Sequence, residues 1–215
     1  MIDVIDTAVQ IVVLLICLAI SMYFIVKTKE KSWVLMHLYY LSYLLGNLYW
    51  QAVAFYYGAT PEISVVSDLS WYASYIFLCL FLFMECEKHL GKDFNSKAKC
   101  TGIKRIIPFL PIPFVSGMAL LYMKYGKIVS NVIYAILMAV LLYNAIRNIL
   151  CFNDRYIRYI SFVVILNCLA EYGSWTFSFY YYDISTWANP YYWFNALIAV
   201  IFLIYLIVKK REVAR

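Results

Sequence analysis

Charged side chains are scarce in this chain: Asp, Glu, Lys and Arg together make up 14% of its 215 residues, whereas 65% are apolar. Soluble globular domains carry about 25% charged residues, which help to cover their surface. The composition therefore excludes a water-soluble fold and predicts an integral protein of the cell membrane.

Histidine is nearly absent, and the cysteines lack the spacing of a metal site. The two histidines, His37 and His89, lie away from the polar residues discussed below, so that no Ser–His–Asp or Cys–His arrangement can be read. Cys79 and Cys86 are seven residues apart, without a second pair or a histidine at metal-ligand spacing. We therefore expect no enzyme, no metal and no cofactor. None of the six cysteines falls in an expected outside loop, which predicts that the chain has no structural disulfide.

Seven apolar segments are each close to the roughly 20 residues that a helix needs to cross the hydrocarbon core of a bilayer. They predict an all-α, seven-helix transmembrane bundle that forms a single domain over residues 1–215. The expected spans are 8–26, 33–57, 65–86, 106–123, 128–149, 157–182 and 187–208.

The basic residues are concentrated on one side of the membrane, because nearly all of them belong to every second connecting segment. Sixteen of the eighteen lie in the segments that follow the first, third, fifth and seventh spans or in the span ends that border them, and only Lys124 and Lys127 lie on the other side. Because short loops rich in Lys and Arg remain in the cytoplasm, we expect the amino terminus outside and the carboxyl terminus inside. Attraction of this face to anionic lipid accounts for the net charge of +6 without nucleic acid. Asp3 and Asp6 have the wrong sign for the start of a secretory signal, so we expect the first span to remain in the mature protein.

Two parts of the chain resemble each other in a way that predicts an internal repeat. Segment 50–57, WQAVAFYY, aligns with segment 175–182, WTFSFYYY, in a register that places Asp68 opposite Asn189. The copies would run in the same direction, as two three-helix units joined by the fourth helix, a 3+1+3 parallel repeat like that of SWEET-type sugar facilitators. Chance similarity between two aromatic-rich hairpins is the alternative. Pro108, Pro111 and Pro113 should bend or partly unwind the fourth span, either as a gating hinge or as a kinked linker.

Glu171 is the polar residue that a membrane should exclude most strongly. It lies near the middle of the sixth span, where a carboxylate costs at least about 2.5 kcal/mol. Asn167 and Trp175, one helical turn before and after it, share its face, which should therefore point into the bundle. Glu171 either binds a ligand or forms a hydrogen bond with Asn47 or Gln51 of the second helix.

Further candidates for a binding site lie in the outer half of the bundle. Asp68 either contacts a ligand or stabilises the positive end of its own helix dipole. The aromatic residues there exceed what a belt at the lipid headgroups requires, which favours either a lined pocket or dense packing by tyrosine. Aromatic walls around a buried carboxylate would hold an organic cation or a flat apolar ligand. The candidate ligand-binding set comprises Asn47, Trp50, Gln51, Asp68, Trp71, Tyr72, Tyr75, Asn167, Glu171, Trp175, Asn189 and Trp193.

Segment 61–75, PEISVVSDLSWYASY, resembles a stretch of the heptahelical input domains of bacterial sensor kinases and diguanylate cyclases, in which an Asp, a Trp and a Gly-Tyr pair open a membrane helix. Asp68, Trp71 and Tyr75 match this motif, whereas Ser74 replaces the glycine. The segment around Glu171 is similar to the acidic site in the sixth helix of these domains. The resemblance implies ligand sensing, and because the sequence ends at residue 215 the signal would pass to a separate partner. Microbial rhodopsins share the expected topology, but no lysine lies within 187–208 to bind retinal.

We therefore predict a small-molecule-binding, heptahelical receptor of a bacterial inner membrane, which contacts lipid and signals to a cytoplasmic protein through the basic segment 88–105. A small-solute transporter of 3+1+3 design is one alternative, and it would need a polar path through the inner half of the bundle. A membrane scaffold subunit, which needs no cavity, is another. The inner thirds of the first, third and seventh spans are mostly Leu, Ile, Val and Phe, which favours the receptor.

Overall fold

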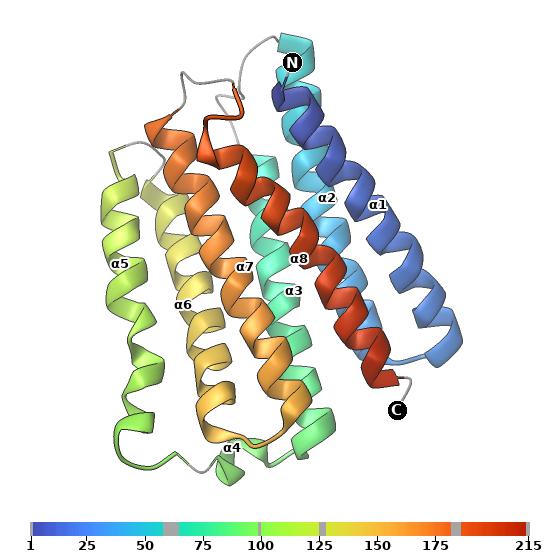
Figure 1. Ribbon diagram of the computed structural model, residues 1–215, viewed down its shortest axis with the longest axis vertical. Coiled ribbons are helices and arrows are strands. Elements are labelled where there is room, and N and C mark those ends of the chain that lie inside the picture. Colours follow the sequence, from blue (N-terminus) through green and yellow to red (C-terminus); the bar gives the residue numbers. More distant parts are fainter. Residues whose placement is uncertain (1, 58–64, 99, 125–127, 182–185, 214–215) are drawn as a thin grey trace.

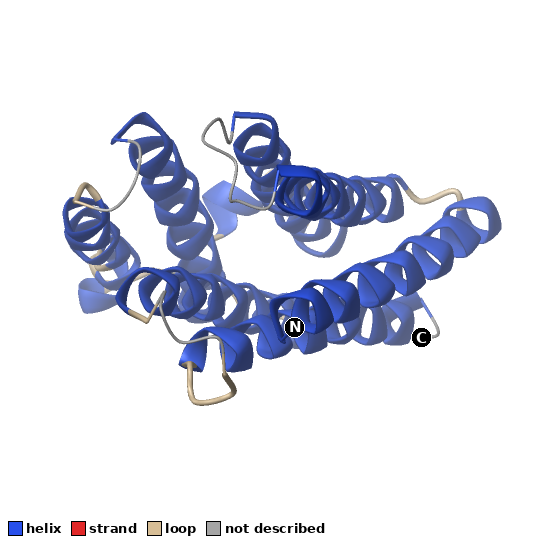
Figure 2. Ribbon diagram, turned by 90° about the horizontal axis from the view of Figure 1, so that it is seen from above, coloured by secondary structure: helices blue, strands red, loops and turns tan. Residues whose placement is uncertain are grey.

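The computed structural model describes residues 2–57, 65–98, 100–124, 128–181 and 186–213. Within these ranges the regular structure is entirely helical, and short connections join the helices (Figure 2). The six long helices described are α1 (Ile2–Thr28), α2 (Lys31–Tyr57), α3 (Val65–Leu90), α6 (Ile128–Cys151), α7 (Arg155–Tyr180) and α8 (Pro190–Val213), and a shorter one is α5 (Pro111–Tyr122). A one-turn helix, α4 (Phe94–Lys97), lies between α3 and α5. Six of the predicted spans each overlap one long helix, and the fourth overlaps η2 (Ile107–Phe109) and α5, so the expected all-helical bundle is confirmed.

Six of these helical segments are long and apolar enough to cross a membrane. They are Ile5–Thr28, Val65–Leu90, Gly102–Tyr122, Ile128–Cys151, Arg155–Tyr180 and Pro190–Glu212. Helix α2 is as long as α1, at 27 residues, but it is less apolar. Its buried face carries Tyr39, Tyr40, Tyr43 and Asn47, whose polar groups lower the hydropathy of the segment although they point into the protein.

The proline-rich start of the fourth predicted span departs from a regular α-helix, as expected. Two 3₁₀ turns, η1 (Gly102–Arg105) and η2 (Ile107–Phe109), precede α5, which is only 12 residues long. Pro108 lies within η2 and Pro111 begins α5. Because proline lacks a backbone N–H, it fits the first turn of a helix and interrupts a continuous one.

The helices form a closed series of neighbours (Figure 1). Packing contacts link α1 to α2, α2 to α3, α3 to α6, α6 to α7, α7 to α8 and α8 back to α1. Helix α5 lies at the edge of the bundle against α6. The two chain ends lie at opposite ends of the bundle, and the connections α1–α2, α3–α5 and α6–α7 all lie at the end near the carboxyl terminus. We call this the basic end, because these connections and the last turn of α8 carry most of the lysine and arginine residues.

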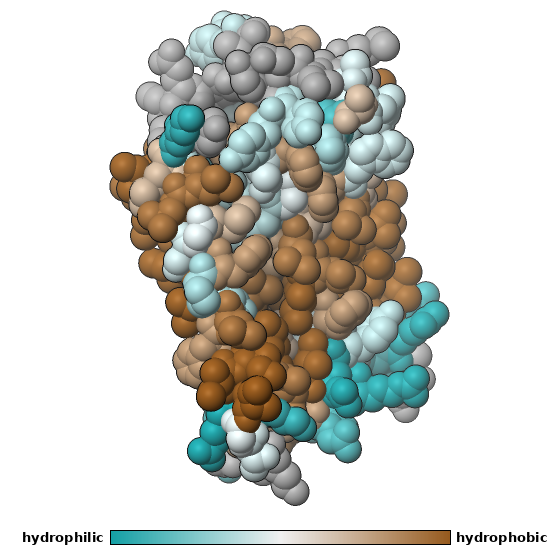
Figure 3. All heavy atoms as spheres, turned by 60° about the vertical axis from the view of Figure 1, so that its left-hand side comes forward, coloured by the Kyte–Doolittle hydropathy of each residue, from teal (hydrophilic) through white to brown (hydrophobic). Residues whose placement is uncertain are grey.

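The surface and the interior have the distribution expected of a membrane bundle. Figure 3 shows one face with a broad apolar band and with hydrophilic residues gathered near the basic end. Seven side chains, each at most 1% exposed, form a layer across the interior of α3, α6 and α7 that we call the apolar layer. Its members are Leu78, Phe81, Leu82, Met138, Leu141, Ile160 and Val164. In each of these three helices the apolar layer separates the basic end from a group of polar side chains described next.

Candidate functional site

The carboxyl group of Glu171 points into the bundle and contacts tyrosine hydroxyls from two other helices. Glu171 is 3% exposed. The hydroxyl of Tyr43 on α2 donates a hydrogen bond of 2.8 Å to Oε1. The hydroxyl of Tyr134 on α6 lies 3.4 Å from Oε2 and 3.2 Å from the hydroxyl of Tyr75 on α3. Helices α2, α3, α6 and α7 thus meet at one carboxyl group, whose partners are tyrosines rather than the expected Asn47 or Gln51.

Two buried polar groups beside this carboxyl group have no hydrogen-bond partner among the described residues. Asn167, one turn before Glu171 on α7, accepts a 3.4 Å hydrogen bond from the hydroxyl of Tyr39, but its Nδ2 is unpaired. The hydroxyl of Tyr205 on α8 is also unpaired, and its ring packs edge-on against Tyr39 at 5.9 Å between centroids. Both side chains are 0% exposed. Buried donors in proteins are nearly always paired, with protein, water or ligand, so these two groups are the ones that a bound molecule could pair with.

Aromatic rings enclose this group of polar side chains. Trp175 stacks on Tyr134 with 4.0 Å between ring centroids and 14° between ring planes. On the other side Tyr43 packs edge-on against Phe202 of α8 at 4.9 Å. We call this arrangement the Glu171 cluster, and it comprises Tyr39, Tyr43, Tyr75, Tyr134, Asn167, Glu171, Trp175, Phe202 and Tyr205. Four of these nine were in the predicted set.

A second polar group joins α1, α2 and α3 and contains three further predicted residues. Asn47 donates a 2.9 Å hydrogen bond to Oε1 of Gln10 and accepts one of 3.2 Å from Nε1 of Trp71. The ring of Trp50 lies 5.9 Å from that of Trp71. The indole of Trp71 fits here because Gly46 has no side chain, and a Cβ at that position would collide with it. Gln51, one turn after Asn47, is half-buried.

The remaining predicted residues lie outside the Glu171 cluster. Asp68 is in the first turn of α3, where it accepts a 2.8 Å hydrogen bond from Ser130 of α6, about 10 Å along the helix from Tyr75. Tyr72 is buried between these two positions. Asn189 accepts a bond from the backbone N–H of Tyr191 and donates one to the carbonyl of Tyr181, so it orders the turn before α8. Trp193 is 62% exposed and donates to the carbonyl of Trp187, so it faces away from the bundle.

A buried series of hydrogen-bonded polar side chains starts from α1 and was not predicted from the sequence. Nδ2 of Asn195 donates a 2.7 Å hydrogen bond to Oδ2 of Asp6, and Ser174 donates one of 2.7 Å to Oδ1 of Asn195. Asp6 was considered only as a charge near the start of the chain. The spacing of four residues between Asp6 and Gln10 could have revealed that both lie on one helical face. That face is buried against α2 and α8.

A buried ion pair at the basic end was also missed. Glu85 of α3 and Lys209 of α8 are each 0% exposed and lie 2.7 Å apart. Lys209 also contacts Glu212 at 3.0 Å and Glu30 at 3.2 Å, and Lys88 contacts the same two glutamates. From the sequence, Lys209 was interpreted only as one of the basic residues that indicate the topology. Because Lys209 lies one helical turn after Tyr205, it is on the same face of α8, which points into the bundle.

A histidine lies against this ion-pair network. Nε2 of His89 is 3.4 Å from Glu212 and 4.0 Å from Glu85, and its ring stacks on Tyr156. Glu85, His89 and Glu212 thereby bring three potential metal-ligand atoms within 4.8 Å of one another. Lys209 contacts one oxygen of each glutamate, Oε1 of Glu85 and Oε2 of Glu212.

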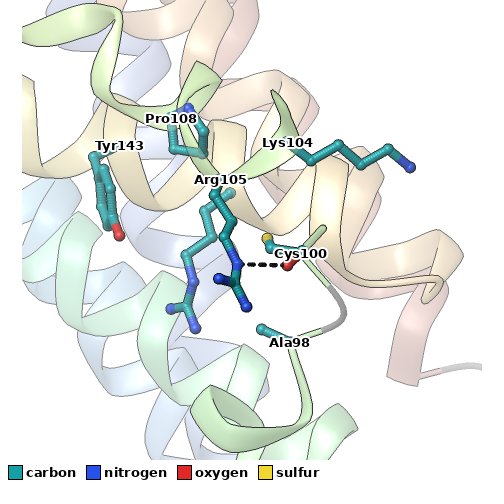
Figure 4. Close-up of a pocket in the computed structure, with 7 residues that line it drawn as sticks. Ala98, Cys100, Lys104, Arg105, Pro108 and Tyr143 are labelled. Carbon is teal, nitrogen blue, oxygen red and sulfur yellow. Dashed lines mark hydrogen bonds between the residues drawn. The ribbon is translucent and has the colours of Figure 1, made fainter. Parts of the chain in front are cut away.

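The prediction that the chain has no structural disulfide is wrong, because the structure joins Cys100 to Cys151. Their Cα atoms are 5.0 Å apart, within the range of ordinary disulfides. The prediction used only the expected side of the membrane on which each cysteine lies. It could not show that the segment after α4 folds back onto the end of α6. The disulfide borders a hollow at the basic end, which is drawn in Figure 4.

These features define a helical, multi-pass membrane protein with polar and aromatic side chains gathered inside the bundle. Comparisons of the chain with models of protein families, with curated proteins and with solved structures found no match.

Proposed function

We propose that this protein is a seven-span membrane receptor that binds a small molecule in the Glu171 cluster and signals to a separate cytoplasmic protein. The observation that carries the proposal is the pair of unpaired buried groups, Asn167 Nδ2 and the Tyr205 hydroxyl, beside the Glu171 carboxyl group. A small molecule with a cationic or donor group for Glu171 and an acceptor for Asn167 would complete these hydrogen bonds. The surrounding ring faces would add cation–π attraction.

The order of residues along α8 provides a route from this cluster to the basic end. Tyr205, at the cluster, and Lys209, in the ion-pair network, are one helical turn apart. Helix α3 also connects the two sites, over a longer distance, because Tyr75 lies in the cluster and Glu85 lies in the network. A ligand that shifts α8 relative to α3 would therefore alter the Glu85–Lys209 contact, next to the basic segment 88–105. On α3, α6 and α7 the apolar layer opposes the passage of a polar solute, which supports this reading over transport along these three helices.

The first test is the identity of what the purified protein carries. We expect native mass spectrometry of the wild-type protein to find a bound small molecule, and Glu171→Gln to lose it because the amide carries no negative charge. Glu87→Gln is the matched control, since it makes the same chemical change on α3 at the basic end, and it should retain the molecule. If the wild type carries nothing, or if both variants retain the molecule equally, the receptor proposal fails and a scaffold without a ligand becomes the better account.

The second test concerns the seven crossings, including α2. Because the chain ends lie at opposite ends of the bundle and the basic end should be cytoplasmic, a reporter fused to the carboxyl terminus should be active only inside the cell. A tag at the amino terminus should be accessible only from outside. Finding both ends on one side would require an even number of crossings and would contradict the proposed topology.

A transporter of 3+1+3 design is the second candidate, and the order of helix neighbours favours it. The contacts among α1, α2 and α3 follow the same order as those among α6, α7 and α8. When the two units are matched helix by helix, the α3–α6 contact corresponds to the α8–α1 contact. Helix α5 lies outside both units as a linker. This is the arrangement that an internal duplication would produce. Uptake of the identified molecule into liposomes separates the two candidates, since a receptor would bind it without carrying it across.

A further inference from the structure

The hollow beside the disulfide gathers basic side chains at the surface of the basic end. Its volume is about 180 Å³, and it is lined by Ala98, Cys100, Lys104, Arg105, Pro108, Tyr143 and Arg147. In Figure 4 the side chain of Arg105 extends across the hollow toward Ala98, whereas that of Lys104 extends away from it. Arg105 comes from η1 and Arg147 from α6, so two separate elements each supply one guanidinium group.

Neutral oxygen atoms hold both guanidinium groups in place. Nε of Arg105 donates a 2.9 Å hydrogen bond to the carbonyl of Cys100. Arg147 donates to Oδ1 of Asn95 at 2.7 Å and to the carbonyl of Asn95 at 3.3 Å. Across the described ranges neither arginine forms a salt bridge with a carboxylate. Each guanidinium has five N–H donors, so both retain donors and an unneutralised positive charge.

The backbone around the two arginines is constrained. Cys100 lies against Cys151, the last residue of α6 and one helical turn beyond Arg147, with 5.0 Å between their Cα atoms. Pro108 lies buried in η2 on the other side of the hollow. Two guanidinium groups held in this way lose little conformational freedom when they bind an anion, and their planar donor pairs match the oxygens of a phosphate group.

Apolar residues next to the hollow are exposed as a lipid-facing surface would be. Ile106 is 66% exposed, Phe109 50% and Leu110 59%, and all three belong to the same segment as Arg105. A phospholipid whose phosphate occupies the hollow could therefore lay its acyl chains along η2. The cytoplasmic leaflet, which the basic end should face, is the one that carries anionic lipid.

We propose that the hollow is a phosphate-group site, in which Arg105 and Arg147 together bind the phosphate of an anionic phospholipid or a free phosphate ion. The site is separate from the Glu171 cluster. Occupation would tie η1 to α6 across the hollow, and so would stabilise the segment between α3 and α5.

The test uses the full chain in detergent, titrated separately with short-chain phosphatidylglycerol, with short-chain phosphatidylcholine and with inorganic phosphate. Native mass spectrometry counts the bound molecules. Replacing both arginines, in R105Q/R147Q, should weaken binding about tenfold or more, because two charge-assisted contacts are lost. The matched control is R155Q/R158Q, which removes the same charge from exposed arginines at the same end and should change binding less than about twofold.

The arms of the experiment distinguish the sources of the phosphate group. Selective retention of phosphatidylglycerol that depends on Arg105 and Arg147 supports a lipid site, and binding of inorganic phosphate alone with the same dependence supports a site for the free ion. Equal loss in both double variants would mean diffuse attraction and would overturn the proposal, as would no binding by the wild type. If R105Q/R147Q unfolds, the single variant Arg105→Gln decides, because its side chain is exposed and it should still lose about threefold or more.

Discussion

Replacing Lys209 by methionine is expected to lower the free energy of unfolding by about 3–5 kcal/mol, because it leaves the carboxylate of Glu85 buried without its counter-charge. Both side chains of the pair are 0% exposed and the two charged atoms lie 2.7 Å apart. Reversible unfolding by SDS in mixed micelles, followed by circular dichroism, measures the change.

Lys88→Met is the matched control for this prediction. Lys88 contacts Glu30 and Glu212, two of the carboxylates that Lys209 also contacts, but its side chain is 40% exposed. Exposed ion pairs contribute about 0–1 kcal/mol, so the control should lose no more than that. Equal losses in the two variants would show that burial does not set the strength of this network. Combining Lys209→Met with Glu85→Met should recover part of the loss, because no buried charge then remains unpaired.

Removing the hydroxyl of Tyr43 should give the second large effect. Tyr43→Phe takes away the 2.8 Å hydrogen bond to Oε1 of Glu171. Hydrogen bonds to charged groups contribute about 1.5–3 kcal/mol, and the free energy of unfolding should fall by that amount if the carboxyl group accepts as an anion. The same SDS titration measures it.

Tyr40→Phe provides the comparison on the same helix. Tyr40 is also buried, but its hydroxyl donates to the neutral carbonyl of Phe202 at 2.9 Å, so its loss should cost about 0.5–1.5 kcal/mol. A double-mutant cycle isolates the contact itself: in a Glu171→Leu background, Tyr43→Phe should have almost no further cost. If Tyr43→Phe costs as much without the carboxyl group as with it, the hydrogen bond to Glu171 does not stabilise the bundle.

The sequence predicted the helical segments well, because each was read from a long run of apolar residues. Six long helices and the shorter α5 overlap the seven predicted spans, and the prolines before α5 interrupt the helix as expected. Glu171 was expected to point inward, and it does. The partners of the polar residues were predicted less well. Tyr43 and Tyr134 were missing from the candidate set, because a tyrosine in an apolar helix looks the same whether it packs against lipid, packs in the core or binds a carboxyl group.

Residues near the ends of the spans were the hardest to interpret. Asp6 and Lys209 were read as terminal charges, yet both are buried and paired inside the bundle. Cys100 and Cys151 were expected to remain unpaired, and they form a disulfide. Trp193 and Asn189 were predicted to line a site, whereas one is exposed and the other orders a turn. These outcomes depend on which way a helix end is rotated or, for Cys100, on how the segment after α4 folds back, and a hydropathy pattern does not contain that information.

The sequence by itself determined that this protein is a helical membrane protein and which segments form its helices, because the transfer of each segment into a bilayer depends mainly on its own composition. Only the tertiary structure decided which polar groups meet: Glu171 with tyrosines of two other helices, Glu85 with Lys209, and Arg105 with Arg147 around one hollow. These contacts join residues far apart in the chain. They depend on the rotation and the neighbours of each helix, which are set by the packing of all helices together.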